Sequence, residues 1–271
     1  MMGFDWGEAW KREQAKRRHA DDADYWNMRA PSFAKTAGTS PYAKTFLKLA
    51  GIQPGETVFD MGCGSGTLAL PLAREGHVVE AADFSTNMLK LMMKRAELEG
   101  ASGFIHSHTL AWKDDFANSG IPVCDVAVAS RSIATDDMLA ALSKLNSMAR
   151  RRVCLTLATS SSPRHDPVIG KAMGIVIDTI PDYIFAMNIL FDMGIEPELT
   201  YIRSERSDVY ASKEEAVEKF ATIYEVTTEQ HSMLEAYTEN HMIPTQTADG
   251  KQGWKYDHMR VTSWAFISWE K

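Results

Sequence analysis

The chain has 271 residues, of which 45% are hydrophobic and 24% are charged. These values are ordinary for a globular protein, and they exclude a largely disordered, collagenous or low-complexity chain. Lys and Arg number 29 and Asp and Glu 36, so the formal charge is −7. An acidic chain repels phosphate backbones, which argues against a general nucleic-acid binder, although a local basic patch stays open.

The cysteine content and the N-terminal segment indicate in which cellular compartment the protein is expected. Cys63, Cys124 and Cys154 are scattered and lack metal-binding spacing, so we expect buried free thiols rather than a disulfide framework. Residues 1–18 are polar without the apolar core of a signal peptide, and no stretch approaches the roughly 20 apolar residues of a membrane span. We therefore expect a cytoplasmic protein that does not bind membranes.

The first fifty residues are expected to be helical and amphipathic. The basic run 11–18 is flanked by acidic residues, which favours a solvated helix face over an RNA contact. A further helix is predicted over 41–50, because Pro41 is suited to a first helical turn and Gly51 to the position after the last.

From residue 57 onward, short apolar strands alternate with helices. Strands are predicted over 57–61, 77–83, 104–109, 124–129 and 153–158, and helices over 67–74, 86–99 and 136–149. This alternation predicts an α/β fold with a parallel sheet covered on both faces. After residue 197, strands over 198–203 and 258–269 enclose two predicted helices, 213–224 and 228–241.

A glycine-rich turn, Asp60-Met-Gly62-Cys-Gly64-Ser-Gly66-Thr67, follows the first of these strands and opens a helix. Glycines permit positive φ and let a ligand approach the backbone. The dinucleotide fingerprint would need glycines at 62, 64 and 67, but residue 67 is Thr. An acidic residue at position 60 suits a cationic ligand, such as the ammonium and sulfonium of S-adenosylmethionine, better than a pyrophosphate. A purely structural turn is the alternative.

Asp83 ends the second strand, 17 residues after Gly66. A carboxylate there can accept two hydrogen bonds from vicinal ribose hydroxyls. The alternative, a helix cap or loop charge, weakens once Asp83 is taken together with the glycine turn.

The segments 59–67 (FDMGCGSGT) and 82–89 (ADFSTNML) resemble the class I S-adenosylmethionine-dependent methyltransferases. The resemblance covers roughly residues 45–157. It implies S-adenosyl-L-methionine as cofactor, with S-adenosyl-L-homocysteine as product. Gly62, Gly64 and Gly66 would line the methionine and ribose, Asp83 would bind the ribose hydroxyls, and Phe84 would lie beside the adenine.

The resemblance also implies an architecture. We expect one doubly wound methyltransferase domain over 1–271, with a seven-stranded, mostly parallel sheet whose last two strands form an antiparallel hairpin. Within it, residues 1–50 would be a helical cap and 51–160 the cofactor-binding core. Residues 161–271 would be the substrate-side half, with a helical insertion at about 212–249.

The third strand departs from the family, which often places an Asp there for the adenine amino group. The run His106-Ser-His108-Thr-Leu110-Ala111-Trp112 has no acid until Asp114. Backbone groups of Leu110 and Ala111, or the Trp112 ring, are the candidates for contacting adenine. The two histidines share one strand face, and a packed or hydrogen-bonded pair is favoured over a metal pair because no third ligand is readable.

The loop after the fourth strand, Ser130-Arg131-Ser132, faces the transferred methyl group in the family. We expect Ser130 to contact the cofactor and Arg131 the substrate; a structural loop is the alternative. The Asn/Asp-Pro-Pro of adenine N6 enzymes and the Pro-Cys of cytosine C5 enzymes are absent.

His165, after the fifth strand, is the candidate general base because histidine titrates near neutrality. An exposed loop histidine is the alternative, and transfer from a sulfonium can proceed without a base. Tyr25, Trp26 and Arg29 are candidate substrate contacts in the cap. A stripe of Met233, Tyr237, His241 and Met242 is expected to be core more than pocket.

The leading hypothesis is methyl transfer to a small-molecule acceptor by direct in-line displacement, in a monomer or homodimer. One alternative is a methyltransferase acting on RNA or a protein side chain. The other is a cofactor-binding interaction module without catalysis.

Overall fold

The computed structural model describes residues 4–16, 40–160, 162–176, 179–247 and 249–271. The chain divides into two compact units. Unit 1 comprises Met1–Leu157, Asp182–Ile202 and Trp264–Lys271. Unit 2 comprises Ala158–Pro181 and Arg203–Ser263.

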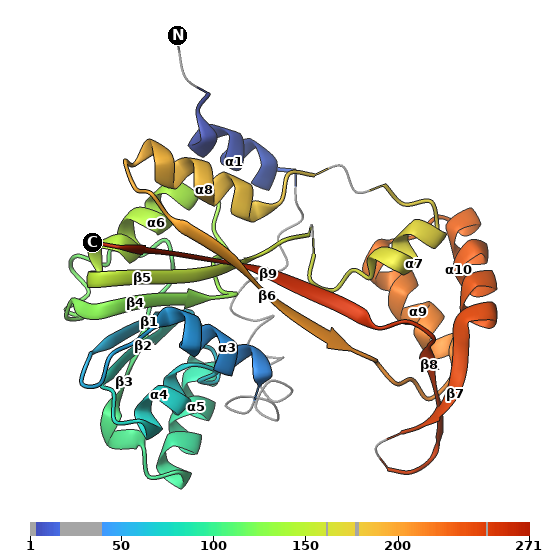
Figure 1. Cartoon of the computed structure of the whole chain (residues 1–271), viewed down its shortest axis with the longest axis horizontal. Helices are drawn as coiled ribbons and strands as arrows, with labels where there is room; N and C mark the ends of the chain where they lie inside the picture. Colours follow the sequence, from blue (N-terminus) through green and yellow to red (C-terminus); the bar gives the residue numbers. More distant parts are fainter. Residues whose placement is uncertain (1–3, 17–39, 161, 177–178, 248) are drawn as a thin grey trace. The chain divides into compact units, whose positions relative to one another are not determined.

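A seven-stranded sheet has the order β3-β2-β1-β4-β5-β9-β6 (Figure 1). Its strands are β1 Val58–Met61, β2 Val79–Asp83, β3 Ile105–Thr109, β4 Cys124–Ser130, β5 Ala149–Ala158, β6 Glu198–Arg206 and β9 Arg260–Glu270. The first five strands pair in parallel. The Lys271 amide donates to the Arg151 carbonyl, so the end of β9 lies beside the start of β5 and the two are antiparallel. The predicted sheet, with its antiparallel final hairpin, is confirmed.

Two hydrophobic clusters cover the two faces of this sheet. Side chains that alternate along a strand point to opposite faces, so Phe59 and Met61 join one cluster while Val58 joins the other. Helices α1 Trp6–Gln14, α6 Met138–Ser147 and α8 Asp182–Asp192 contribute to the first cluster. Helices α3 Pro41–Ala50, α4 Ala69–Arg74 and α5 Thr86–Leu98 contribute to the second. Burial on both faces explains why β1 and β4 are apolar almost throughout.

At the edge of the sheet, beyond the short 3₁₀ helix η1 Ser102–Phe104, β3 carries the two histidines. His106 Nδ1 lies 2.8 Å from Glu80 Oε1, and His108 Nε2 lies 2.6 Å from Glu80 Oε2. Both histidines therefore hydrogen-bond the same carboxylate, as in the favoured alternative. No group of three potential metal ligands occurs among the residues that the structure describes.

Helix α1 confirms the predicted solvated face for the described part of the basic run. Lys11 is exposed and pairs with Glu8 and Asp137, whereas the preceding Trp10 is buried and donates to the Thr135 carbonyl at 3.0 Å. The rest of the run and the cap residues Tyr25, Trp26 and Arg29 lie outside the described residues.

Unit 2 contains helices α7 Pro167–Ala172, α9 Lys213–Tyr224 and α10 Thr228–His241, with the antiparallel hairpin of β7 Met242–Gln246 and β8 Gln252–Tyr256. Its core is built from Ile169, Phe220, Leu234 and neighbouring apolar residues. The expected core stripe on α10 is wrong in part. Met242 is buried, but Met233 is 40% exposed, because the buried face runs through Leu234 and Thr238, one residue further along.

The three cysteines are buried and free, as expected. Over the described ranges, none of the helices is both long enough and apolar enough to span a bilayer.

Candidate functional site

The glycine-rich turn between β1 and α4 is bent by three glycines with positive φ: Gly62 (74°), Gly64 (54°) and Gly66 (88°). A Cβ at Gly62 would collide with Ser132, and one at Gly66 would come within 2.7 Å of Leu70 Cγ. A Cβ at Gly64 would meet nothing within 4 Å. The outer glycines therefore serve close packing, whereas Gly64 presents backbone to open space, where a ligand can approach it.

Asp83, at the end of β2, faces this turn from the neighbouring strand. The carboxylate is only 5% exposed, and each oxygen accepts one amide hydrogen bond: Oδ2 from Gly64 at 2.9 Å and Oδ1 from Ser85 at 2.8 Å. Burial raises the pKa of Asp83, and these two bonds oppose that rise. Each oxygen keeps a lone pair that can accept a ribose hydroxyl. The half-buried Phe84 follows directly in sequence.

Asp60 in β1 lies beside this turn, and its carboxyl accepts a hydrogen bond from the Ala69 backbone. Its side chain is 1% exposed, and its Oδ2 has no hydrogen-bond partner among the described residues. Burial, followed by repulsion from Asp83, raises the pKa of Asp60 to about 7. A buried carboxyl of this kind is stabilised in its charged form by a nearby cation.

These observations fit S-adenosylmethionine. The unpartnered Asp60 oxygen can accept a hydrogen bond from an ammonium group or from a water bound to it, and the open face of Gly64 admits a ligand against the backbone. Asp83 accepts a hydrogen bond from the Gly64 amide and has acceptor capacity left for a ribose.

The loop after β4 lies against the glycine turn. The Ser132 hydroxyl donates to the Met61 carbonyl at 2.6 Å. The Ser130 hydroxyl bonds the Tyr42 hydroxyl at 2.8 Å, and Tyr42 also bonds Thr156 Oγ1 at 2.6 Å. Burial raises the pKa of Tyr42, while the charge of Arg131 acts to lower it.

Arg131 stacks its guanidinium carbon 4.1 Å from the ring centre of Tyr42 and 5.6 Å from that of Trp264. Sequence reasoning missed Tyr42, Thr156 and Trp264. They lie on α3, β5 and β9, and no local motif links these elements.

On the side expected to bind adenine, the described contacts are internal. The Leu110 amide donates to the Asp83 carbonyl at 3.1 Å, and the Ala111 amide donates to Asp114 Oδ2 at 2.8 Å. Trp112 is 8% exposed and donates to the Ser132 carbonyl at 2.8 Å. Trp112 thus acts here as a packing residue that ties two loops together, and the adenine contacts of all three residues stay predictions.

His165 belongs to unit 2, whereas the glycine turn belongs to unit 1. Its ring stacks on Tyr224 with centres 4.6 Å apart. Burial and the nearby charge of Arg260 lower the pKa of His165. Its role as a base stays a prediction.

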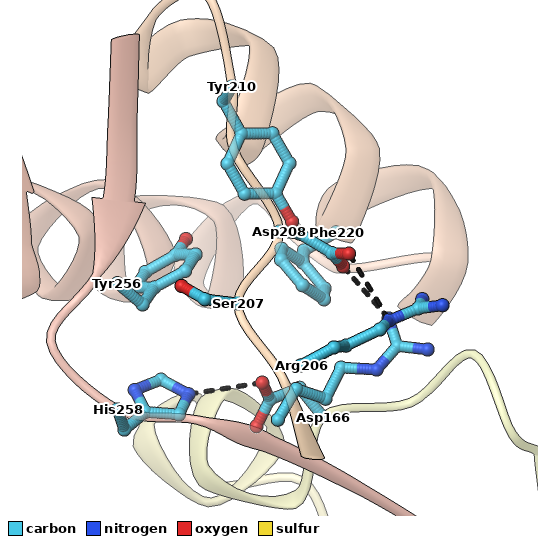
Figure 2. Close-up of a pocket in the computed structure, with 9 residues that line it drawn as sticks. Asp166, Arg206, Ser207, Asp208, Tyr210, Phe220, Tyr256 and His258 are labelled. Atoms are coloured by element: carbon cyan, nitrogen blue, oxygen red, sulfur yellow. Dashed lines mark hydrogen bonds and ion pairs between the residues drawn. The ribbon is translucent and has the colours of Figure 1, made fainter. Parts of the chain in front are cut away.

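Unit 2 also holds a small polar pocket that sequence reasoning did not find (Figure 2). On one side, His258 Nε2 lies 3.0 Å from Asp166 Oδ2. On the other, Asp208 forms ion pairs with Arg206, Lys219 and Arg260. Asp166 also caps α7, so the pocket is tied into the helical core of unit 2.

Comparison with known proteins identifies the family of one part of the chain. Residues 58–151, from β1 to the start of β5, match the family model of the methyltransferase domain. Residues 58–151 form a methyltransferase domain of the class I, S-adenosylmethionine-dependent family. The glycine turn, Asp83 and the loop at Arg131 all fall inside this domain, and all of unit 2 lies outside the matched residues.

The matches to curated relatives differ in how much of each protein they cover. An uncharacterized protein of Haemophilus influenzae is 34% identical over 186 residues, which is 66% of this chain and 66% of that protein. A 2-phytyl-1,4-naphtoquinone methyltransferase of Nostoc is 46% identical over 54 residues, 19% of this chain and 24% of that enzyme. The matches span just under two thirds of the first relative and about a quarter of the second.

Among solved structures, the YcgJ protein of Bacillus subtilis superimposes with a TM-score of 0.52 at 11% identity. The match covers 85% of this chain and 97% of that one. At this identity, the likeness shows a shared fold and no more.

Proposed function

We propose that the protein transfers a methyl group from S-adenosyl-L-methionine to a small-molecule acceptor by direct in-line displacement, leaving S-adenosyl-L-homocysteine. The observation that carries the proposal is the buried, unpartnered carboxyl oxygen of Asp60 next to a glycine turn whose Gly64 face is open. A buried carboxyl without a partner costs stability, and binding of a cation recovers that cost.

Each element of the cofactor site has a part in this proposal. Asp60 would face the methionine ammonium directly or through water, and Asp83 would hold the ribose hydroxyls. Gly62, Gly64 and Gly66 would shape the turn around the ligand. The adenine end would lie against Phe84, with Leu110, Ala111 and Trp112 behind it, and Ser130 would contact the cofactor from β4.

The cofactor, when bound, supplies a methyl group already activated on a sulfonium. The chain is then left to align the acceptor with that methyl group and to exclude water. Arg131, together with Tyr25, Trp26 and Arg29 of the cap 1–50, would hold the acceptor. His165 would take a proton from acceptors that must lose one.

The domain plan supports a small acceptor. Residues 51–160 would bind the cofactor, and 161–271, with the insertion at about 212–249, would form the substrate-side half of a single domain. A charge of −7 disfavours RNA. We place the protein in the cytoplasm as a monomer or homodimer, apart from nucleic acid and membranes.

Calorimetric titration with S-adenosylmethionine tests the cofactor site. Asp83→Asn should weaken binding by about tenfold or more, because a charge-assisted hydrogen bond to ribose is lost. Asp192→Asn, which alters an exposed acid of α8, should bind like the parent. If the unaltered protein shows no binding at about 1 mM cofactor, the proposed function fails.

A further inference from the structure

Arg131 has an unusual backbone conformation. Its φ is 56°, in the left-handed region that non-glycine residues rarely occupy. The other described non-glycine residue with positive φ is Glu225, which ends helix α9, where this conformation is common. Arg131 instead follows the central strand β4, at the carboxyl ends of the parallel strands, where the glycine turn also lies.

The strained conformation is held from three sides. The Arg131 amide donates to Thr156 Oγ1 of β5 at 3.1 Å. The next residue, Ser132, donates to the Met61 carbonyl of β1 and accepts the Trp112 indole N–H at 2.8 Å. Backbone strain persists where its surroundings over-determine it, and such positions gather at functional sites.

The side chain of Arg131 is fixed as well. Its guanidinium stacks on Tyr42 and Trp264, and the Tyr42 hydroxyl is in turn held by Ser130 and Thr156. Stacking on aromatic faces leaves the N–H edge of the guanidinium free to bind. Arg131 is exposed, and no carboxylate of the described residues forms an ion pair with it.

The position of Arg131 relates it to the cofactor turn. The neighbouring Ser132 packs against Gly62 so closely that a Cβ on Gly62 would collide with it. Tyr42 stacks against the guanidinium, and the charge of Asp60 acts to raise the pKa of Tyr42. This region thus offers the Asp60 carboxyl to a cationic ligand, and it offers the guanidinium of Arg131, already fixed in place, to an anionic one.

We propose that the methyl acceptor is a net anion with a carboxylate or phosphate group, and that Arg131, oriented by Tyr42 and Trp264, binds that group. The planar fork of guanidinium N–H groups matches both anions and can bind either through two parallel hydrogen bonds. This inference rests on the proposed function and names its substrate class.

The test follows the product. The protein is incubated with methyl-labelled cofactor and a metabolite extract, and the labelled small molecules are passed over an anion exchanger at neutral pH. The labelled product should be retained, whereas the cationic cofactor flows through. Phosphatase treatment separates the two sources: release from the exchanger identifies a phosphate, and continued retention a carboxylate.

Variants connect the product to Arg131. Arg131→Gln should lower label in the retained fraction by about tenfold or more, since the paired charge-assisted bonds are lost, while calorimetric affinity for S-adenosylmethionine stays within about twofold. Arg131→Lys keeps the charge but lacks the planar N–H fork, so its retained label should lie between that of the parent and that of Arg131→Gln. Arg150→Gln, an exposed arginine elsewhere in unit 1, is the matched control and should match the parent.

Three outcomes would overturn the inference. A labelled product that flows through the exchanger contradicts an anionic acceptor while leaving the proposed function intact. If Arg131→Gln and Arg150→Gln give equal amounts of retained label, Arg131 does not bind the acceptor. Bound cofactor with no labelled small molecule contradicts the proposed function, and the inference falls with it.

Discussion

At the scale of single residues, Asp60 links stability to ligand binding. Its carboxyl is buried, its Oδ2 lacks a partner among the described residues, and its pKa is raised to about 7. Such a group weakens the folded protein whenever it is charged. A cationic ligand would reverse that effect, and the same residue would then contribute to affinity.

The raised pKa of Asp60 makes a prediction about pH. The folded state binds more protons than the unfolded chain between about pH 4 and pH 7, so stability without cofactor should fall as pH rises through this window. A rise of about three pKa units corresponds to about 4 kcal/mol. Urea denaturation at several pH values should show a steep decline for the parent protein and a shallower one for Asp60→Asn.

The control for this prediction is Asp192→Asn, whose exposed carboxyl should leave the decline unchanged. Cofactor affinity should change in the opposite direction and rise with pH as Asp60 ionises, except in Asp60→Asn. Equal pH dependence in the parent and Asp60→Asn would show that this carboxyl titrates normally.

At the scale of elements, Thr156 joins three of them. Its hydroxyl bonds Tyr42 of α3 and accepts the amide of Arg131, which follows β4, while Thr156 itself lies fully buried in β5. The contact fixes the loop after β4 relative to the helix and to the sheet.

Replacing Thr156 by the isosteric Val should destabilise the protein by about 1–3 kcal/mol, because the Arg131 amide and the Tyr42 hydroxyl each lose a buried partner. The free energy of unfolding in urea measures this loss. Thr109→Val, an exposed change in β3, should stay within about 0.5 kcal/mol of the parent. A Thr156→Val protein as stable as Thr109→Val would mean that the hydroxyl does not hold the loop.

Elements could be predicted where local chemistry decides them. Helices α9 and α10 match their predicted bounds because Ser212 and Thr227 cap their first turns through side-chain hydrogen bonds. Helix α8 was missed, since its apolar run 183–191 lacks a readable helical period. The hairpin of β7 and β8 was missed because Pro244 within the run argues against a strand, although an edge strand tolerates it.

The residues of the candidate site likewise divide into those that a local motif predicts and those that meet only through packing. Asp60, Gly64 and Asp83 belong to a short motif in which each residue lies near the others along two adjacent strands, so the sequence indicates their meeting. Tyr42 and Trp264 meet Arg131 through packing between elements far apart in the chain. Such contacts leave no local pattern.

At the scale of the whole molecule, the family match covers the cofactor turn and the loop at Arg131 but no part of unit 2. Residues 58–151 carry the methyltransferase domain, and unit 2, with its own core and polar pocket, lies beyond them. The acceptor is therefore sought through the loop at Arg131, inside the matched residues, and through unit 2, outside them. The net charge of −7 and the preorganised Arg131 both favour a small anionic molecule over a polynucleotide.

Methyl transfer sorted by acceptor size tests the central claim most directly. The protein is incubated with methyl-labelled S-adenosylmethionine and a whole-cell extract, and label is counted in the ultrafiltrate, in RNA and in protein, with Asp83→Asn as the inactive reference. We expect label in the ultrafiltrate that depends on Asp83. Label that depends on Asp83 but accumulates in RNA or protein would contradict it.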